Sequence, residues 1–178
     1  MTHHEKATAS DRAIVVTHVF DAPPEAVFRA WTDPEIMSQW YAPEPLTVPK
    51  AEMDLRVGGK YTIVMRDQDG NDFTSTGVYR EILEPERLSY TDSLAEMPSD
   101  WVDMVNESRG EAKGTPVPDS VVTIMFEDVG GKTKVTFRDD FDSTGTRDAM
   151  KQMQMVEGLE GSFMNLEKVL EKTPSMTR

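Results

Sequence analysis

The feature that most constrains the fold is an apolar pattern close to the C-terminal end of the sequence. Apolar side chains recur there at three- and four-residue steps, which is typical of an amphipathic helix. They are Ala149, Met153, Val156, Leu159, Phe163, Leu166 and Leu170. The pattern predicts one long helix with Thr144 or Thr146 as its N-cap, ending near Lys172 before Pro174. A stripe this wide must be buried against another layer of structure.

Short stretches rich in β-branched and aromatic residues supply that layer. Turn signals such as Asp69-Gly70-Asn71 and Gly130-Gly131 separate them. Two short helices are expected after the first strand: one after Pro23-Pro24, and one capped by Asp33 that ends near Trp40. The predicted strands cover residues 14–20, 46–55, 60–67, 73–83, 87–93, 120–127 and 133–141.

This order of elements predicts an α+β domain in which a curved antiparallel sheet wraps around the long C-terminal helix. Antiparallel sheets commonly bury one face. A strongly twisted sheet does not touch a straight helix along its whole length. We therefore expect an apolar cavity between the sheet and the helix.

We expect a flexible N-terminal tail at residues 1–12, a single domain at residues 13–173 and a C-terminal tail at residues 174–178. Segment 96–118 is too long for a hairpin loop and is rich in Pro and Gly, so we expect it to be irregular. It is read as a surface insertion, as a lid in which Trp101 and Met104 cover one mouth of the cavity, or as a subunit interface.

Composition excludes several classes of function. The net charge of −13 argues against nucleic-acid binding, which requires Lys and Arg at phosphates, and against docking on anionic membranes. The absence of Cys rules out disulfides, thiolate metal sites and Cys nucleophiles. No apolar run is long enough to insert into a membrane and no signal peptide is recognisable, so a cytoplasmic location is expected.

An ordered set of motifs carries a family resemblance over residues 14–172. It includes Trp31-Thr32-Asp33-Pro34-Glu35, Asp54-Leu55-Arg56-Val57-Gly58-Gly59, Gly77-Val78-Tyr79 and Pro85-Glu86-Arg87-Leu88. Together they resemble the Aha1-like branch, named for the activator of Hsp90 ATPase, of the START/Bet v 1 helix-grip superfamily. The resemblance implies the helix-grip fold, a central cavity that binds hydrophobic ligands in many members, and a link to stress response. Family helices carry a Trp where Leu159 stands, which would enlarge or reshape the cavity.

The candidate ligand-binding residues are the aromatic and Met side chains expected to face the cavity, together with one acid on the long helix. Met is flexible and common at adaptable binding surfaces, although ordinary core filling is the plainer explanation of these residues. Glu157 shares a helix face with Met153 and Met164, and solvation is its plainer interpretation. The candidates are Trp40, Tyr61, Ile63, Met65, Tyr90, Trp101, Met104, Met125, Met150, Met153, Glu157, Leu159 and Met164.

No catalytic, metal or cofactor site is expected, because no nucleophile, metal-ligand or phosphate-loop pattern occurs. His18 is expected to be a hydrogen-bonded residue of the sheet. The leading hypothesis is a protein that binds an apolar small molecule. A polyketide cyclase or aromatase-like enzyme that uses Tyr61, Tyr90 and Glu157 is one alternative. An Hsp90-related interaction module is another, and a homodimer is a further partner to consider.

Overall fold

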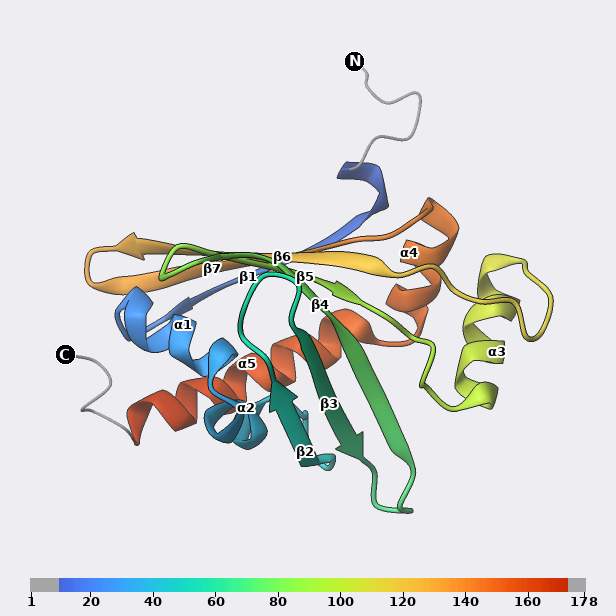
Figure 1. Cartoon of the computed structure of the whole chain (residues 1–178), viewed down its shortest axis with the longest axis horizontal. Coiled ribbons are helices and arrows are strands. Elements are labelled where there is room, and N and C mark those ends of the chain that lie inside the picture. The colour runs from blue at the N-terminus through green and yellow to red at the C-terminus, as the bar shows by residue number, and fades with distance from the viewer. Residues whose placement is uncertain (1–9, 173–178) are drawn as a thin grey trace.

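A seven-stranded antiparallel sheet in the order β1-β7-β6-β5-β4-β3-β2 covers the C-terminal helix α5 (Figure 1). The computed structural model describes residues 10–172. The predicted fold class is confirmed. The strands are β1 (Ala13–Phe20), β2 (Thr47–Met53), β3 (Lys60–Arg66), β4 (Asp72–Leu83), β5 (Arg87–Asp92), β6 (Ser120–Val129) and β7 (Lys132–Asp140).

The predicted tails fall mostly outside the described residues. Of residues 1–12, the structure describes only Ser10–Arg12, which form a 3-10 helix and not a loose tail. The predicted tail at residues 174–178 lies wholly outside the described part of the chain. No helix within residues 10–172 has the length and apolar character needed to cross a lipid bilayer.

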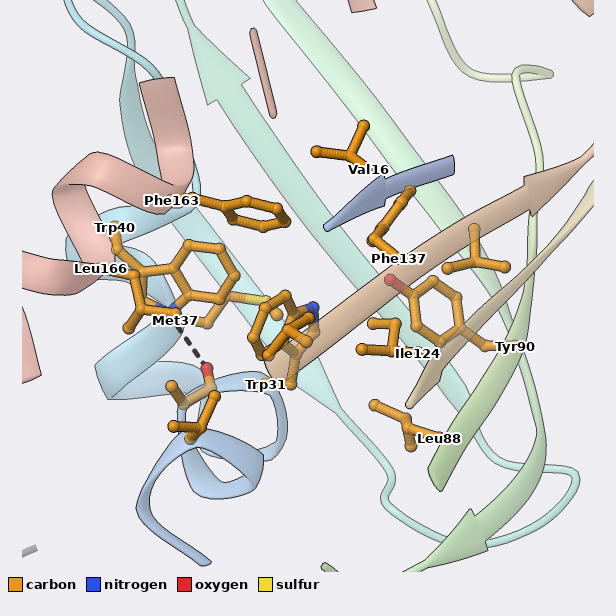
Figure 2. Packing of buried hydrophobic residues seen from close by; sticks show 14 of the residues in the cluster. Val16, Trp31, Met37, Trp40, Leu88, Tyr90, Ile124, Phe137, Phe163 and Leu166 are labelled. Carbon is orange, nitrogen blue, oxygen red and sulfur yellow. Dashed lines mark hydrogen bonds between the residues drawn. The ribbon is translucent and has the colours of Figure 1, made fainter. Parts of the chain in front are cut away.

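Two short helices, α1 (Pro24–Thr32) and α2 (Pro34–Trp40), follow β1 as the sequence predicts. Each begins with a proline, whose missing N–H is not needed in the first turn. Asp33 caps α2, because its Oδ1 accepts hydrogen bonds from the N–H groups of Glu35 and Ile36 at 2.9 and 3.4 Å. The indole N–H of Trp40 donates to the carbonyl of Ala30 at 3.1 Å, which ties the two helices together (dashed line in Figure 2).

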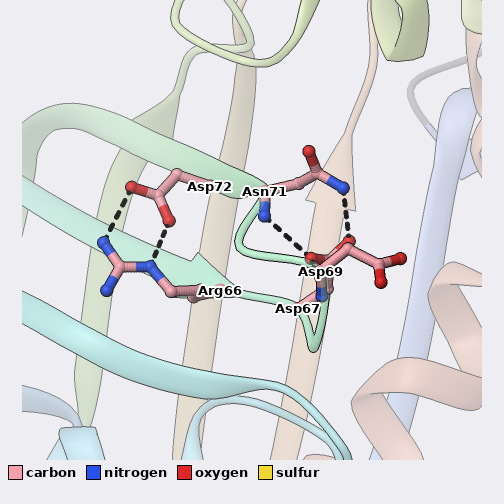
Figure 3. A network of polar contacts seen from close by, with 5 residues as sticks. All are labelled: Arg66, Asp67, Asp69, Asn71 and Asp72. Atoms are coloured by element: carbon pink, nitrogen blue, oxygen red, sulfur yellow. Dashed lines mark hydrogen bonds and ion pairs between the residues drawn. The ribbon is translucent and has the colours of Figure 1, made fainter.

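The β3–β4 hairpin is held by the side chains around its turn (Figure 3). The Asp67 Oδ1 accepts hydrogen bonds from the N–H groups of Asp69 and Asn71 at 3.0 and 2.8 Å. The Arg66 guanidinium pairs with Asp72 across the base of the hairpin at 2.7 Å. Among the described residues, strand β2 pairs with β3 alone. It contains Pro49 and has a register shift between Thr47 and Lys50.

Segment 96–118 differs from the prediction, because it contains a regular helix, α3 (Ser99–Arg109). Gly110 ends this helix in the left-handed conformation (φ 81°), which glycine adopts without steric cost. The buried Asn106 amide donates to the Thr115 carbonyl at 2.9 Å, and Arg109 donates to the Asn106 Oδ1 at 2.9 Å. These bonds fold the returning chain onto the helix, which packs beside α4 (Figure 1).

The prediction of one continuous C-terminal helix is wrong, because the chain forms α4 (Thr144–Gln152) and α5 (Met155–Glu171). Gln154 lies between them in the left-handed region with φ 67°. The predicted N-cap is also wrong. The cap is Ser143, whose Oγ accepts from the Thr146 N–H at 3.1 Å. The apolar periodicity continues across the break, which explains why the pattern reads as one helix.

Helix α5 is anchored on two sides. His18 of β1 forms a hydrogen-bonded pair with Glu167 (Nε2 to Oε2, 2.5 Å), so the histidine is bonded to the helix and not within the sheet. On the other side, the Ser162 hydroxyl donates to the Tyr41 carbonyl at 2.7 Å, and the Asn165 amide donates to the Ala42 carbonyl at 3.0 Å. These bonds fix the rotation of the helix about its own axis.

Aromatic side chains from the short helices, the sheet and α5 form the main core (Figure 2). Trp31 packs edge to face against Trp40, with ring centroids 4.7 Å apart, and against Phe163 at 5.9 Å. Burying a side chain as large as Phe163 stabilises the fold by about 2 kcal/mol. This core lies at one end of the space between the sheet and α5, and the cavity described next borders it.

Candidate functional site

A cavity of about 210 Å³ lies between the inner face of the sheet and helix α5. Trp31 and Trp40 border it on the side of the short helices, and Phe137 and Phe141 border it on the side of β7. Segment 96–118 contributes another wall. Its lining residues are Met97, Trp101, Val117 and Pro118. Most of the surface that faces the cavity is therefore apolar or aromatic.

The structure brings together about half of the predicted ligand-binding residues. They reach the cavity from helices α2, α3, α4 and α5, from the turn between α4 and α5, and from strands β3 and β5. The residues that line the cavity are Trp40, Met65, Tyr90, Trp101, Met150, Met153 and Leu159.

Tyr61 and Ile63 are buried but do not line this cavity. Both border a much smaller space beside Tyr79 and Tyr90. The Tyr61 hydroxyl donates to the carbonyl of Thr91 at 2.8 Å, so it is used within the sheet. The two residues support the cavity wall and do not present polar groups to a ligand.

The predictions for Glu157 and Met164 as cavity residues are wrong. Glu157 is exposed, which agrees with the alternative interpretation that it is solvated, and Met164 is 59% exposed. Both lie on the side of α5 opposite Leu166, because each helical residue turns the chain by about 100°. The inward face of α5 is instead formed by Leu159, Ser162, Phe163 and Leu166.

Met104 and Met125 also point away from the cavity. Met104 is 55% exposed on α3, whereas Trp101 of the same helix lines the cavity. Met125 is 37% exposed, because the alternation along β6 turns its neighbours Ile124 and Phe126 inward. Of the two residues predicted to cover the mouth of the cavity, Trp101 lines it and Met104 does not.

Two acidic residues that were not predicted from the sequence line the cavity, Asp92 of β5 and Asp139 of β7. A signal for both exists in the strand alternation. Asp92 follows Leu88 and Tyr90 at two-residue steps, and Asp139 follows Val135 and Phe137 in the same way. Period-two spacing from buried apolar residues places both carboxyl groups on the inner face of the sheet.

Burial governs the electrostatics of this acidic pair. Asp92 keeps some accessible surface because it borders the cavity, yet desolvation raises its pKa to about 7. Asp139 is 2% exposed, and desolvation together with the nearby charge of Asp92 raises its pKa well above the ordinary value. The Ser120 hydroxyl bonds to the Asp139 carboxyl and opposes that rise.

Two tyrosines complete the polar end of the cavity. Burial raises the pKa of both Tyr41 and Tyr90, and the charges of Asp92 and Asp139 raise each further. Both hydroxyls therefore stay protonated at neutral pH and are available as hydrogen-bond donors. No group of three or more His, Asp or Glu side chains within residues 10–172 is placed to hold a metal ion.

The fold is shared with solved bacterial proteins. One from Nitrosomonas europaea is 23% identical, with a TM-score of 0.76, covering 93% of this chain and 98% of its own. One from Mycobacterium smegmatis is 21% identical, with a TM-score of 0.75, covering 93% of this chain and 94% of its own. One from Chromobacterium violaceum is 26% identical, with a TM-score of 0.71, covering 90% of this chain and 97% of its own.

No curated protein sequence matches the chain. A family model does match, over residues 21–171, and it is described as Activator of Hsp90 ATPase homolog 1-like protein. The match covers strands β2 to β7 and helices α1 to α5, and so includes the walls of the cavity. The chain therefore belongs to the family of Activator of Hsp90 ATPase homolog 1-like proteins.

Proposed function

We propose that this protein binds a small apolar molecule in the cavity between the sheet and α5. The observation that carries the proposal is the cavity of about 210 Å³ with its mainly apolar and aromatic lining. An apolar cavity of about 150 Å³ is large enough to hold benzene. Sites for drug-sized ligands occupy roughly 300 Å³ or more. The size therefore favours a ligand with one ring and a short substituent.

The tryptophan residues of the cavity lining allow ligand binding to be followed by fluorescence. The chain has three tryptophans, and all of them, Trp31, Trp40 and Trp101, line the cavity. Ethylbenzene is a suitable probe because it has one ring, a short chain and no polar atom. We expect it to change the tryptophan emission in a saturable way, and native mass spectrometry of the freshly purified protein would detect a retained natural ligand.

A matched pair of variants locates the binding site. Leu159→Phe adds a ring where Leu159 lines the cavity, so it should weaken ethylbenzene binding by about tenfold or more. Met164→Phe adds a similar volume on the exposed side of the same helix and should leave binding unchanged. If ethylbenzene gives no saturable response in the wild-type protein, and no ligand is retained on purification, the proposal is wrong.

Catalysis at this site has weaker support. A cyclase-like enzyme would require Tyr61, Tyr90 and Glu157 to meet at one place in the cavity. Only Tyr90 lines it, because Tyr61 is bonded to the Thr91 carbonyl and Glu157 is exposed. We therefore propose binding, and not a reaction, as the role of the cavity.

A further inference from the structure

The carboxyl group of Asp139 is the least satisfied polar group of the cavity. Asp139 is 2% exposed, lines the cavity, and its Oδ1 has no hydrogen-bond partner among residues 10–172. A buried polar atom without a partner costs free energy, and the cost is greater when the group is charged. A bound molecule that donates a hydrogen bond to Oδ1 would remove this cost.

A second carboxyl group lies at the same end of the cavity. Asp92 of β5 pairs in register with Ser120 of β6, and Asp139 of β7 pairs with Val122 of the same strand. Asp92 and Asp139 therefore flank two neighbouring inward positions of β6. Tyr61 contributes only a long contact to Asp92, with 3.5 Å between its hydroxyl and Oδ1.

The described residues that line the cavity supply no positive charge to balance these acids. Among the described residues that line it there is no Lys, Arg or His. The walls carry aromatic rings instead, and the faces of Trp and Tyr rings attract cations. An occupant has to supply the hydrogen-bond donors, and a positive charge on it would be favoured by both the acids and the rings.

We propose that the cavity selects a small aromatic or aliphatic amine whose ammonium group lies between Asp92 and Asp139. The inference rests on the proposed binding function and adds the chemical class of the ligand. The apolar body would contact rings such as Trp101 and Phe137, and one N–H would donate to the Asp139 Oδ1. A carboxylate or phosphate ligand would be repelled by the same acids.

The groups that act on the pKa of the two acids carry zero or negative charge, although Arg138 pairs with one of them, Asp140. Tyr41, which follows α2, and Tyr90 of β5 face the two acids, as does Tyr61 of β3. Asp119, which precedes β6, adds negative charge beside Asp92, and Asp140, the last residue of β7, adds negative charge beside Asp139. Burial raises the pKa of both acids, and a bound ammonium group would lower it, so binding would release protons to solvent.

Two probes of equal size test the proposal, benzylamine and ethylbenzene, which differ in one terminal group. Isothermal titration calorimetry at neutral pH should give benzylamine at least about tenfold tighter binding than ethylbenzene, since hydrogen bonds to charged groups are the stronger kind. Asp139→Asn keeps the shape and removes the charge, so it should abolish the preference for the amine while ethylbenzene binding stays within about twofold.

Glu157→Gln is the matched control. It removes one negative charge from the exposed side of α5, outside the cavity lining. This variant should keep the full preference for benzylamine. Equal affinities for the two probes in the wild-type protein, or a preference that survives Asp139→Asn, would overturn the inference and leave the proposed function intact. Failure of both probes to bind would overturn both.

Discussion

The buried carboxyl of Asp92 makes the stability of the protein depend on pH at the scale of one residue. An unfolded Asp has a pKa of about 3.9, whereas burial raises the pKa of Asp92 to about 7. Between these values the folded protein holds more protons than the unfolded chain. Stability from this group is therefore fully present below about pH 4 and is lost as the pH rises through about 7.

We predict that the free energy of unfolding falls between pH 5 and pH 8, and that Asp92→Asn makes this fall shallower. Each unit of pKa difference corresponds to about 1.4 kcal/mol, so the contribution of Asp92 over this range is on the order of 2 kcal/mol. Asp139 acts with the same sign. Urea unfolding at a series of pH values measures the slope.

Asp72→Asn is the control for this measurement. The hydrogen bond with Arg66 lowers the pKa of Asp72, so its contribution is lost only in more acidic solution. The slope between pH 5 and pH 8 should be the same in this variant as in the wild-type protein. A wild-type stability that rises over this range would contradict the assigned burial of both cavity acids.

At the same scale, sequence reasoning located individual side chains where the local period decided their direction. Trp40 and Tyr90 were expected at the cavity and line it. Asp139 was missed because an acidic side chain does not belong to an apolar pattern, although its spacing from Phe137 predicts the inner face. Met164 was placed wrongly by its spacing from Met153, although its spacing from Leu166 predicts the outer side of α5.

At the scale of elements, the break between α4 and α5 allows both helices to turn an apolar side towards the interior. Ala149 and Met150 of α4 are buried, as are Phe163 and Leu166 of α5. The break is made by Gln154, whose positive φ is unfavourable for a residue with a Cβ atom. Tertiary packing therefore holds a backbone conformation that local preference opposes.

We predict that Gln154→Gly increases the free energy of unfolding by about 1 kcal/mol, because glycine adopts the left-handed conformation without steric cost. Thermal and urea unfolding measure the change. Gln154→Ala is the matched control, since it shortens the side chain but retains the Cβ atom, and it should give little or no stabilisation. A Gln154→Gly variant less stable than the wild type would count against the left-handed turn.

Helix α3 was missed for a different reason. Of its eleven residues only Val105 and Asn106 are buried, so the segment lacks the repeated apolar positions that identify an amphipathic helix. The Asn106 and Arg109 side chains instead bond to the returning chain, and these partners lie outside the helix. Such bonds form only once the fold brings the two parts of the segment together.

For the whole molecule, the seven strands and the two short helices agree with the sequence prediction within a few residues. Their signals are local: alternation along strands, glycine at hairpin turns, and the Asp33 cap. The cavity was expected from the order of these elements. Its polar end was not expected, because the approach of β5 and β7 across β6 depends on strand order, which one sequence does not specify.

The walls of the cavity come from elements spread along the described chain, which predicts a single cooperative unfolding transition. Helicity followed by far-ultraviolet circular dichroism and burial followed by tryptophan emission should give the same midpoint. A Trp101→Phe variant supplies the control, because its emission reports only Trp31 and Trp40 in the main core. If the tryptophan emission of the wild-type protein showed an earlier transition that is absent from the Trp101→Phe variant, segment 96–118 would unfold on its own.

Strand β2 ends the sheet, and its sequence determines whether another chain could extend it. An exposed edge strand offers free N–H and C=O groups to which a foreign strand can bond, which is a route to aggregation. Pro49 has no N–H to offer, and the register shift between Thr47 and Lys50 interrupts the regular spacing of the remaining groups. The charged side chains of Lys50 and Glu52 add to this barrier. The open sheet is thereby protected at this side against intermolecular strand addition.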